Sequence, residues 1–308
     1  MNFRPMILGL LGVLACGGSL GAADAPSVSI AAASDLVFCL EELNREFTNS
    51  HPAVTLKTST GSSGNFFAQI RNGAPFDVFL SADMSYPKEL VKAGAAEESS
   101  LFQYAMGRLA LWTVKTNLSL TNGLLALRDP AVRRVAIANP EHSPYGRAAR
   151  EALRHAGLWE DLQPRLVLGD NISQTAQFVQ TGNADAGIVA LSLVLSPKLR
   201  NVGRWVQVPP DTYPPLEQGA VLTRRGTDNK AARAYLKFLQ SEKAREIFNR
   251  YGFRLPSGKA HRDAATVVGQ PSRLSRRASR PRTPARARRP RRQARRLPHY
   301  PVRRLVAL

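Results

Sequence analysis

Small polar side chains occupy the points where extended sequence patterns give way to helical ones. Ser34, Ser63 and the Asn-Ile-Ser turn at 171–173 each lie between an apolar or alternating segment and a helical pattern. The start of a helix exposes unpaired backbone N–H groups and the positive end of the helix dipole, and a serine adds a hydroxyl donor. Three such starts, brought together, would form a pocket of uncharged donors suited to a small anion.

An ordinary structural role explains part of this pattern. Serine and aspartate cap helices wherever helices begin, so Ser34 and Asp35 are also typical N-cap residues, and Asn171-Ile172 is also typical of an ordinary turn. The loop 61–64, Gly-Ser-Ser-Gly, is harder to explain as a cap alone because four small residues follow one another. Residue types and spacing therefore leave both interpretations open.

Patterns that would indicate an enzyme are weak. The loop 61–64 lacks the Gly-x-Ser-x-Gly spacing of a hydrolase nucleophile elbow. His51, His142 and His155 lie in separate segments and lack the spacing of metal ligands. We therefore expect a binding protein that is not an enzyme, with no cofactor and no side chain that ligates a metal directly.

Strand and helix patterns alternate between residues 28 and 256, which predicts an α/β fold with mostly parallel sheets. In such sheets ligands bind outside the carboxyl ends of the strands. Strands are predicted at 28–33, 53–59, 76–82, 108–114, 132–139, 165–170, 186–192 and 219–223. Helical patterns begin near residues 36, 63, 87, 143 and 174, and one long helix is predicted over 231–251.

The N-terminal residues 1–23 have the pattern of an export signal. Arg4 precedes the apolar run 6–15, and small residues follow at 21–23. The apolar run is too short for a stable membrane span. Cys16 ends a Val-Leu-Ala-Cys sequence that resembles a lipobox, so lipidation of Cys16 is an alternative to cleavage near residue 23.

The C-terminal residues 257–308 differ in composition from the rest of the chain. They hold 15 Arg, one Lys and one Asp, which is +15 of the chain's net charge of +20. With six prolines and few large apolar residues, this segment is predicted to be disordered. It is interpreted either as a frameshifted reading frame or as a tail that attaches to nucleic acid or an anionic membrane. The remaining chain is close to neutral and needs no polyanionic partner.

Five segments, taken together, resemble the periplasmic molybdate-binding proteins that feed ABC transporters. In order, they are 31–36, 61–83, 139–153, 169–192 and 244–253. The resemblance implies a two-lobed, type II-like periplasmic binding protein with hinge-crossing strands and an oxyanion in the cleft. It implies a first lobe formed by 24–108 and 220–256 and a second lobe formed by 109–219.

The resemblance also implies which residues contact the oxyanion. Ser34 and Ser63 match serines that donate a hydroxyl, and Ile172 matches an aliphatic residue that donates its backbone N–H. Tyr145 matches a position that donates a backbone N–H. Some family members also have a tyrosine at the position of Ala190; here the phenol of Tyr145 is a hypothetical substitute. The alternative is that Tyr145 packs at the cleft rim and only its N–H is used.

The resemblance implies that the protein captures molybdate and tungstate and delivers them to a membrane permease. It also implies that the protein acts as a monomer in the periplasm. Uncharged donors disfavour hydrogen phosphate, because its protonated oxygen finds no acceptor. Sulfate is smaller and would leave donors unused in a pocket sized for molybdate. A binding protein for sulfate or another tetrahedral oxyanion remains the alternative within this class.

Overall fold

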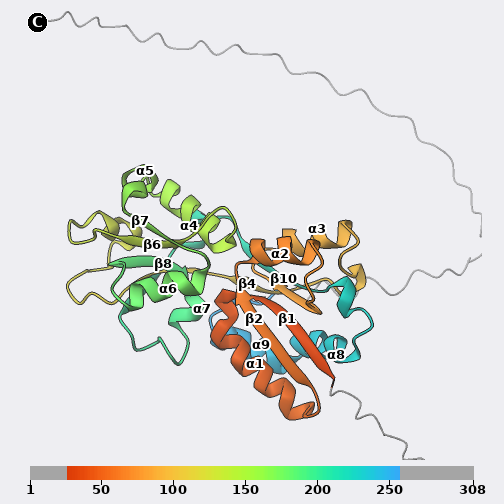
Figure 1. The fold of residues 1–308 in the computed structure, drawn as a ribbon. Helices are drawn as coiled ribbons and strands as arrows, with labels where there is room; N and C mark the ends of the chain where they lie inside the picture. Colours follow the sequence, from red (N-terminus) through yellow and green to blue (C-terminus); the bar gives the residue numbers. More distant parts are fainter. Residues whose placement is uncertain (1–25, 257–308) are drawn as a thin grey trace, which may run out of the picture. The chain divides into compact units, whose positions relative to one another are not determined.

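The computed structural model describes residues 26–256, which form two five-stranded mixed sheets with helices on both faces of each (Figure 1). The first sheet has the strand order β2-β1-β3-β10-β4. Its strands are β1 (Ser27–Ala33), β2 (Thr55–Gly61), β3 (Val78–Ser81), β4 (Phe102–Gly107) and β10 (Leu216–Leu222). Strands β1, β2 and β3 run parallel, and β10 pairs antiparallel with both β3 and β4.

The second sheet has the strand order β7-β6-β8-β5-β9. Its strands are β5 (Leu109–Thr113), β6 (Val135–Ala138), β7 (Leu166–Gly169), β8 (Ala186–Ala190) and β9 (Arg204–Gln207). Strands β6, β7 and β8 run parallel, and β5 pairs antiparallel with β8 and β9. The α/β class expected from the alternating patterns is confirmed.

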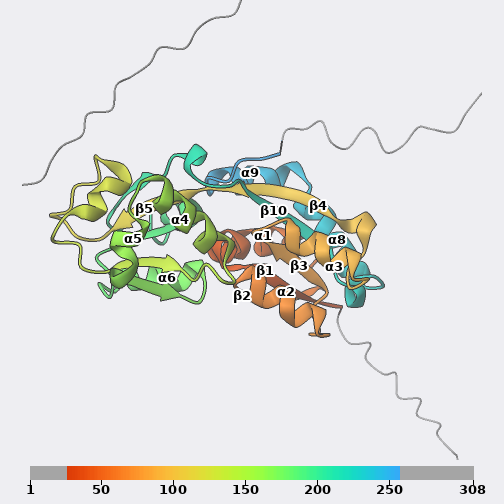
Figure 2. The same ribbon diagram turned by 90° about the horizontal axis from the view of Figure 1, so that it is seen from above.

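The chain passes between the sheets twice. Strand β4 ends at Gly107 in the first sheet and β5 begins at Leu109 in the second, so the first crossing occurs at Arg108. The return lies between β9 and β10, which starts at Leu216 (Figure 2). Leu216 pairs with Gly107 and Gln207 pairs with Ala110, so the two crossing segments run antiparallel beside each other. The lobe boundaries given above stay a prediction.

Helices cover the first sheet on both faces. In Figure 1, α2 and α3 lie above it and α1, α8 and α9 lie below it. Successive side chains along β1 point to opposite faces of the sheet. Ile30 packs in the core with α1, α8 and α9, and Ala31 packs with α2 and α3. The helical elements are η1 (Ser34–Leu36), α1 (Val37–Ser50), α2 (Ser63–Arg71), α3 (Ser85–Lys92), η2 (Glu98–Ser100), η6 (Arg224–Gly226), α8 (Lys230–Leu239) and α9 (Glu242–Arg250).

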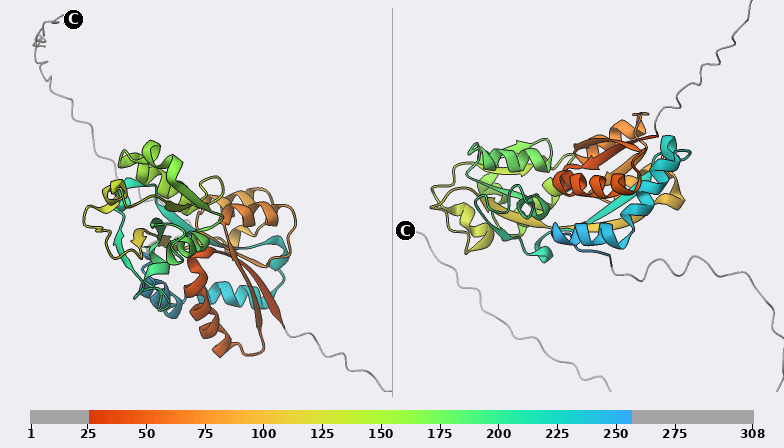
Figure 3. Two further views of the ribbon diagram at one scale, coloured as in Figure 1. Left: turned by 60° about the vertical axis from the view of Figure 1, so that its left-hand side comes forward. Right: turned by 90° about the horizontal axis from the view of Figure 1, so that it is seen from below.

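The single long helix predicted over 231–251 is wrong. The structure has two helices, α8 and α9, which meet at Ser241. The Ser241 hydroxyl accepts a hydrogen bond from the Ala244 N–H at 3.3 Å and so caps α9, while its own N–H donates to the Phe238 carbonyl at 2.9 Å. Apolar residues continue at helical spacing through the break, because α8 and α9 both contact α1 (Figure 3).

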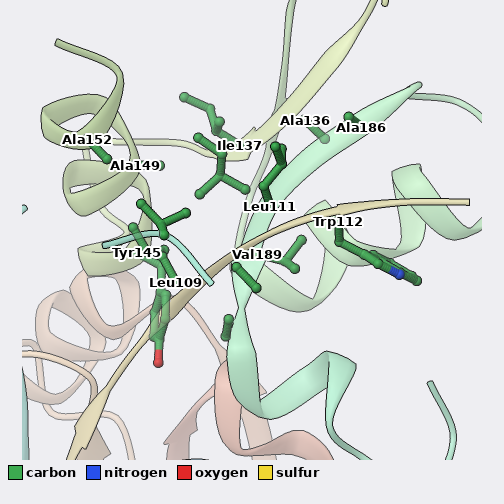
Figure 4. Close-up of a cluster of buried hydrophobic side chains, with 14 of the residues drawn as sticks. Leu109, Leu111, Trp112, Ala136, Ile137, Tyr145, Ala149, Ala152, Ala186 and Val189 are labelled. Atoms are coloured by element: carbon green, nitrogen blue, oxygen red, sulfur yellow. The ribbon is translucent and has the colours of Figure 1, made fainter. Parts of the chain in front are cut away.

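The second sheet has a larger continuous core, part of which is drawn in Figure 4. Leu109, Leu111 and Trp112 of β5 pack against Ile137 of β6 and Val189 of β8. In Figure 1, α4 and α5 lie above this sheet and α6 and α7 lie below it. Its helical elements are η3 (Gly123–Arg128), α4 (Pro144–His155), α5 (Trp159–Leu162), η4 (Gln163–Arg165), α6 (Ile172–Gln180), α7 (Leu191–Val194) and η5 (Pro210–Thr212).

The predictions for 1–23, for Cys16 and for 257–308 lie outside the described residues. Within 26–256, none of the helices combines the length and the apolar composition that a membrane span requires.

Candidate anion-binding site

Ser34 lies at the carboxyl end of β1, where the strand gives way to η1. Its side chain is buried, with 2% of the residue exposed. The Ser34 hydroxyl oxygen lies 3.4 Å from the N–H of Ser173, in the first turn of α6 on the second sheet. Two of the helix starts expected to bind the anion therefore meet across the two sheets.

Ser63 is the first residue of α2 and is 1% exposed. Its hydroxyl oxygen accepts a hydrogen bond from the Ala82 N–H at 2.9 Å. This contact fixes the oxygen and leaves the hydroxyl proton to donate. The backbone N–H of Ser63 has no acceptor among the described residues.

The small residues around Ser63 are explained by a contact between the sheets. The Ser62 hydroxyl and the Gly64 N–H both donate to the carbonyl oxygen of His142, which precedes α4; the Gly64 bond measures 3.0 Å. A Cβ atom on Gly64 would lie 2.6 Å from that carbonyl oxygen. Glycine is therefore required for the loop to approach the second sheet this closely.

Tyr145 is the second residue of α4, and its backbone N–H has no acceptor among the described residues. Ser143 caps this helix by accepting from the Gly146 N–H at 3.3 Å, so the Tyr145 N–H remains free. The phenol packs against the core of the second sheet with its oxygen pointing away from it (Figure 4). That hydroxyl donates to the Asp35 carboxyl at 2.9 Å, which is a different partner from the anion hypothesised above.

Ile172 is the first residue of α6, and its side chain packs in the core of the second sheet. The side chain of Asn171 accepts hydrogen bonds from the N–H groups of Ser173 and Gln174, both at 3.1 Å. This cap leaves the Ile172 N–H without an acceptor among the described residues. Ala190, at the end of β8, is fully buried and offers no side-chain donor.

The four expected ligand residues thus come from four helix starts, two on each sheet. Contacts between the loops that carry them join Ser34 to the start of α6 and the Ser63 loop to the start of α4. The donors are hydroxyl and amide groups. Arg147, two residues after Tyr145, carries a charge but is already bonded to Asp83 at 2.5 Å and to the Tyr86 hydroxyl at 3.0 Å. The arrangement can hold an anion through uncharged donors and helix dipoles.

Asp35 and Gln218 are site residues that the sequence did not reveal. Asp35 accepts from the Gln218 side chain at 2.7 Å and from Tyr145, and Gln218 also lies 3.2 Å from the Tyr145 hydroxyl. Burial raises the pKa of Asp35 from 3.8 to about 6, and the hydrogen bonds from Gln218 and Tyr145 oppose that rise. The sequence pattern indicates a cap at Asp35, and the one signal for its partner is the polar pair Glu217-Gln218 at the start of a strand that is otherwise apolar.

Residues 28–254 match the family model described as bacterial extracellular solute-binding protein. The chain belongs to this family. Membership places it outside the cytoplasm and among binding proteins. Within the described residues, no group of three or more His, Cys, Asp and Glu side chains is placed to hold a metal ion.

Relatives in this family carry a more specific description. The molybdate-binding protein ModA of Azotobacter vinelandii is 40% identical over 246 residues, covering 79% of this chain and 94% of the relative. ModA of Rhodobacter capsulatus is 41% identical over 231 residues, covering 75% and 89%. The solved structure of the periplasmic molybdate-binding protein of A. vinelandii matches with a TM-score of 0.71 at 34% identity, covering 75% of this chain and all of that one. The solute-binding fold is therefore confirmed.

Proposed function

We propose that this protein captures molybdate, and also tungstate, between its two sheets and delivers it to the membrane permease of an ABC transporter. The observation that carries the proposal is the convergence of four helix starts whose donors are all uncharged. The description of the A. vinelandii and R. capsulatus relatives as molybdate-binding proteins supports the choice of anion.

The proposal includes the setting in which the protein acts. It works in the periplasm as a monomer, either free or lipidated at Cys16, and it has no enzymatic activity and no cofactor. One copy carries donors on both sheets, so the site needs no second subunit. Ser34, Ser63, Tyr145 and Ile172 supply the donors, the first two by hydroxyl groups and the last two by backbone N–H groups.

The donor set also determines which anions are accepted. A fully deprotonated tetrahedral oxyanion accepts hydrogen bonds at every oxygen, whereas hydrogen phosphate presents a proton that amide and hydroxyl donors do not accept well. Molybdate and tungstate are nearly the same size and larger than sulfate. The oxygens of sulfate lie closer to the central atom than those of molybdate. Donors that are fixed by four separate helices cannot all move inward to reach them, so sulfate accepts fewer hydrogen bonds.

Thermal unfolding of the purified full-length protein with each anion tests the proposal. A ligand at a hundred times its Kd adds about 2.7 kcal/mol to the free energy of unfolding, which is a shift of several degrees. We expect that shift with molybdate and tungstate and a much smaller one with sulfate or phosphate. An equal shift with sulfate would contradict the specificity, and no shift with any of these anions would contradict the function.

A further inference from the structure

A carboxyl group is buried at the contact between the two sheets, beside the proposed anion site. Asp35 directly follows Ser34 and is 1% exposed. Its Oδ2 atom accepts from the Tyr145 hydroxyl at 2.9 Å and from the Gln218 side-chain amide at 2.7 Å. Asp35 and Gln218 belong to the first sheet and Tyr145 to the second, so this cluster ties the two sheets together.

The fold makes room for this cluster at the crossing between the sheets. A Cβ atom on Gly107, the last residue of β4, would lie 2.2 Å from the Tyr145 oxygen and 2.8 Å from the Gln218 amide nitrogen. No other residue type fits beside the two side chains without displacing them. The cluster is therefore built into the crossing strands themselves.

The groups that face the Asp35 carboxyl leave its charge uncompensated. Burial raises the pKa of Tyr145 on α4, of Tyr104 on β4 and of Cys39 on α1, so all three are neutral near pH 7. Ser192 of α7 donates to the Asp35 backbone carbonyl at 2.7 Å, not to the carboxyl. From β10 only the uncharged Gln218 contacts it.

The basic side chains near Asp35 are bonded elsewhere. Arg108, at the crossing, donates to the Gly252 carbonyl and to the Gln207 side chain, and Arg147 is paired with Asp83. His142, on the loop before α4, has its ring nitrogen 3.1 Å from the Asp170 carbonyl. Among the described residues, no cation forms a salt bridge with Asp35.

Two buried acceptors in the cluster lack donors. The Oδ1 atom of Asp35 and the Oε1 atom of Gln218 have no hydrogen-bond partner within residues 26–256. Buried acceptors without donors are rare because each forfeits its hydration. A proton on Asp35 would remove the uncompensated charge and bring one donor to a cluster that has a surplus of acceptors.

We propose that Asp35 takes up a proton when the oxyanion binds, so that capture of the anion is coupled to protonation of the Asp35–Tyr145–Gln218 cluster. This inference rests on the proposed function, because it requires a dianion at Ser34. A dianion beside a buried carboxylate would place like charges in a region with only uncharged donors. Neutral Asp35 relieves that repulsion and keeps the hydrogen bond from Tyr145 that joins the sheets.

The direction of the pH dependence follows from the two protonation states. In the free protein burial raises the pKa of Asp35 to about 6, and a bound dianion raises that pKa further. Between the two pKa values the complex holds one proton more than the free protein. The affinity therefore falls as pH rises above about 6, by up to tenfold per pH unit, and it is constant below that pH.

Isothermal titration of the full-length protein with molybdate at pH 6, 7 and 8, in buffers of different ionisation enthalpy, measures affinity and proton uptake together. We expect the wild-type protein to take up a fraction of a proton that approaches one, with Kd rising over this range. Asp35→Asn, which keeps the side-chain size, should take up none and bind with a Kd that is constant between pH 6 and 8.

Two control variants separate this effect from other titrating groups. Glu217→Gln removes an exposed carboxyl next to Gln218, and His142→Gln removes the imidazole near the site while its backbone carbonyl stays. Both should retain the wild-type pH dependence. Binding without proton uptake, or loss of the pH dependence in His142→Gln alone, would overturn the inference. The absence of molybdate binding at every pH would instead contradict the proposed function.

Discussion

At the scale of single residues, the hydroxyl of Ser63 is the donor whose orientation is best defined. Its oxygen is held by the Ala82 N–H at 2.9 Å, and the residue is almost fully buried at the start of α2. A hydroxyl held in this way loses little freedom when an anion arrives. Ser63 is therefore positioned to donate to the proposed anion with little reorganisation.

Replacing Ser63 by alanine should weaken molybdate binding at least tenfold. The lost bond to a charged acceptor is worth about 1.5–3 kcal/mol, and each 1.4 kcal/mol is a factor of ten in Kd. The measurement is a calorimetric titration, with circular dichroism to show that the variant is folded. Ser85→Ala, an exposed serine that opens α3 on the same sheet, is the matched control and should bind as the wild type does. Equal affinities for the two variants would remove Ser63 from the site.

Sequence identifies single donors better than it identifies their partners. Ser34 and Ser63 stand out because a small polar residue between a strand and a helix has a local signature. The Asp35–Gln218 bond has none, because the two residues lie 183 positions apart and meet only when β10 returns from the second sheet. A long sequence separation also hides the partner of Tyr145, whose phenol contacts Asp35 across 110 positions.

At the scale of elements, the start of α4 makes two contacts with the first sheet. The His142 carbonyl accepts from the loop before α2, and Arg147 reaches Asp83, which follows β3, and the Tyr86 ring on α3. The first contact joins the loop that carries Ser63 to the loop that precedes Tyr145. The second is about one-third exposed on both sides and lies nearer to solvent. Together they hold the two sheets in the arrangement that the proposed anion site requires.

Breaking the outer contact should speed release of the anion. In Arg147→Met the ion pair with Asp83 is lost, and an exposed pair of this kind is worth about 0.2–1 kcal/mol, or a change of up to about fivefold. Stopped-flow dissociation measured at low salt should show this increase, and the difference from the wild type should shrink as salt screens the pair. Lys92→Met removes a pair that lies wholly within α3 and should leave the rate unchanged. A salt-independent effect would contradict an electrostatic origin.

The elements themselves follow from periodicity wherever a strand or helix buries one continuous face. The alternation of strand and helix patterns predicted the α/β class. Helix α4 begins at Pro144, as the Ser143-Pro144 pair indicates, and α6 begins at Ile172, two residues before the predicted start. Strands β4 and β9 were not predicted, because partly exposed residues interrupt their apolar pattern. The break at Ser241 was missed because the apolar faces of α8 and α9 are in phase, and only the cap geometry distinguishes two helices from one.

At the scale of the whole molecule, the two sheets meet through polar groups as well as apolar ones. The cores of the sheets are separate clusters, and the contacts between them include the Ser34, His142 and Asp35 hydrogen bonds. Such an interface resists full desolvation, so it can open and close more readily than a continuous apolar core. Under the proposed function, an anion bound at this interface would add hydrogen bonds to both sheets at once and so favour the closed arrangement.

The buried carboxyl at this interface should also lower the stability of the ligand-free molecule at neutral pH. The pKa of Asp35 rises from 3.8 in the unfolded chain to about 6 in the folded one, so between these values the folded state binds more protons and stability falls as pH rises. Above pH 7 the ionised carboxyl lowers the free energy of unfolding by about 3 kcal/mol, since each pKa unit is worth 1.36 kcal/mol.

Asparagine has the shape of the neutral acid and carries no such cost. Urea unfolding should therefore show Asp35→Asn gaining about 3 kcal/mol relative to the wild type at pH 7.5, and only about 1 kcal/mol at pH 4.5, where the folded carboxyl is protonated but that of the unfolded chain is largely ionised. A difference between the two proteins that is the same at both pH values would show that Asp35 keeps an ordinary pKa in the folded state.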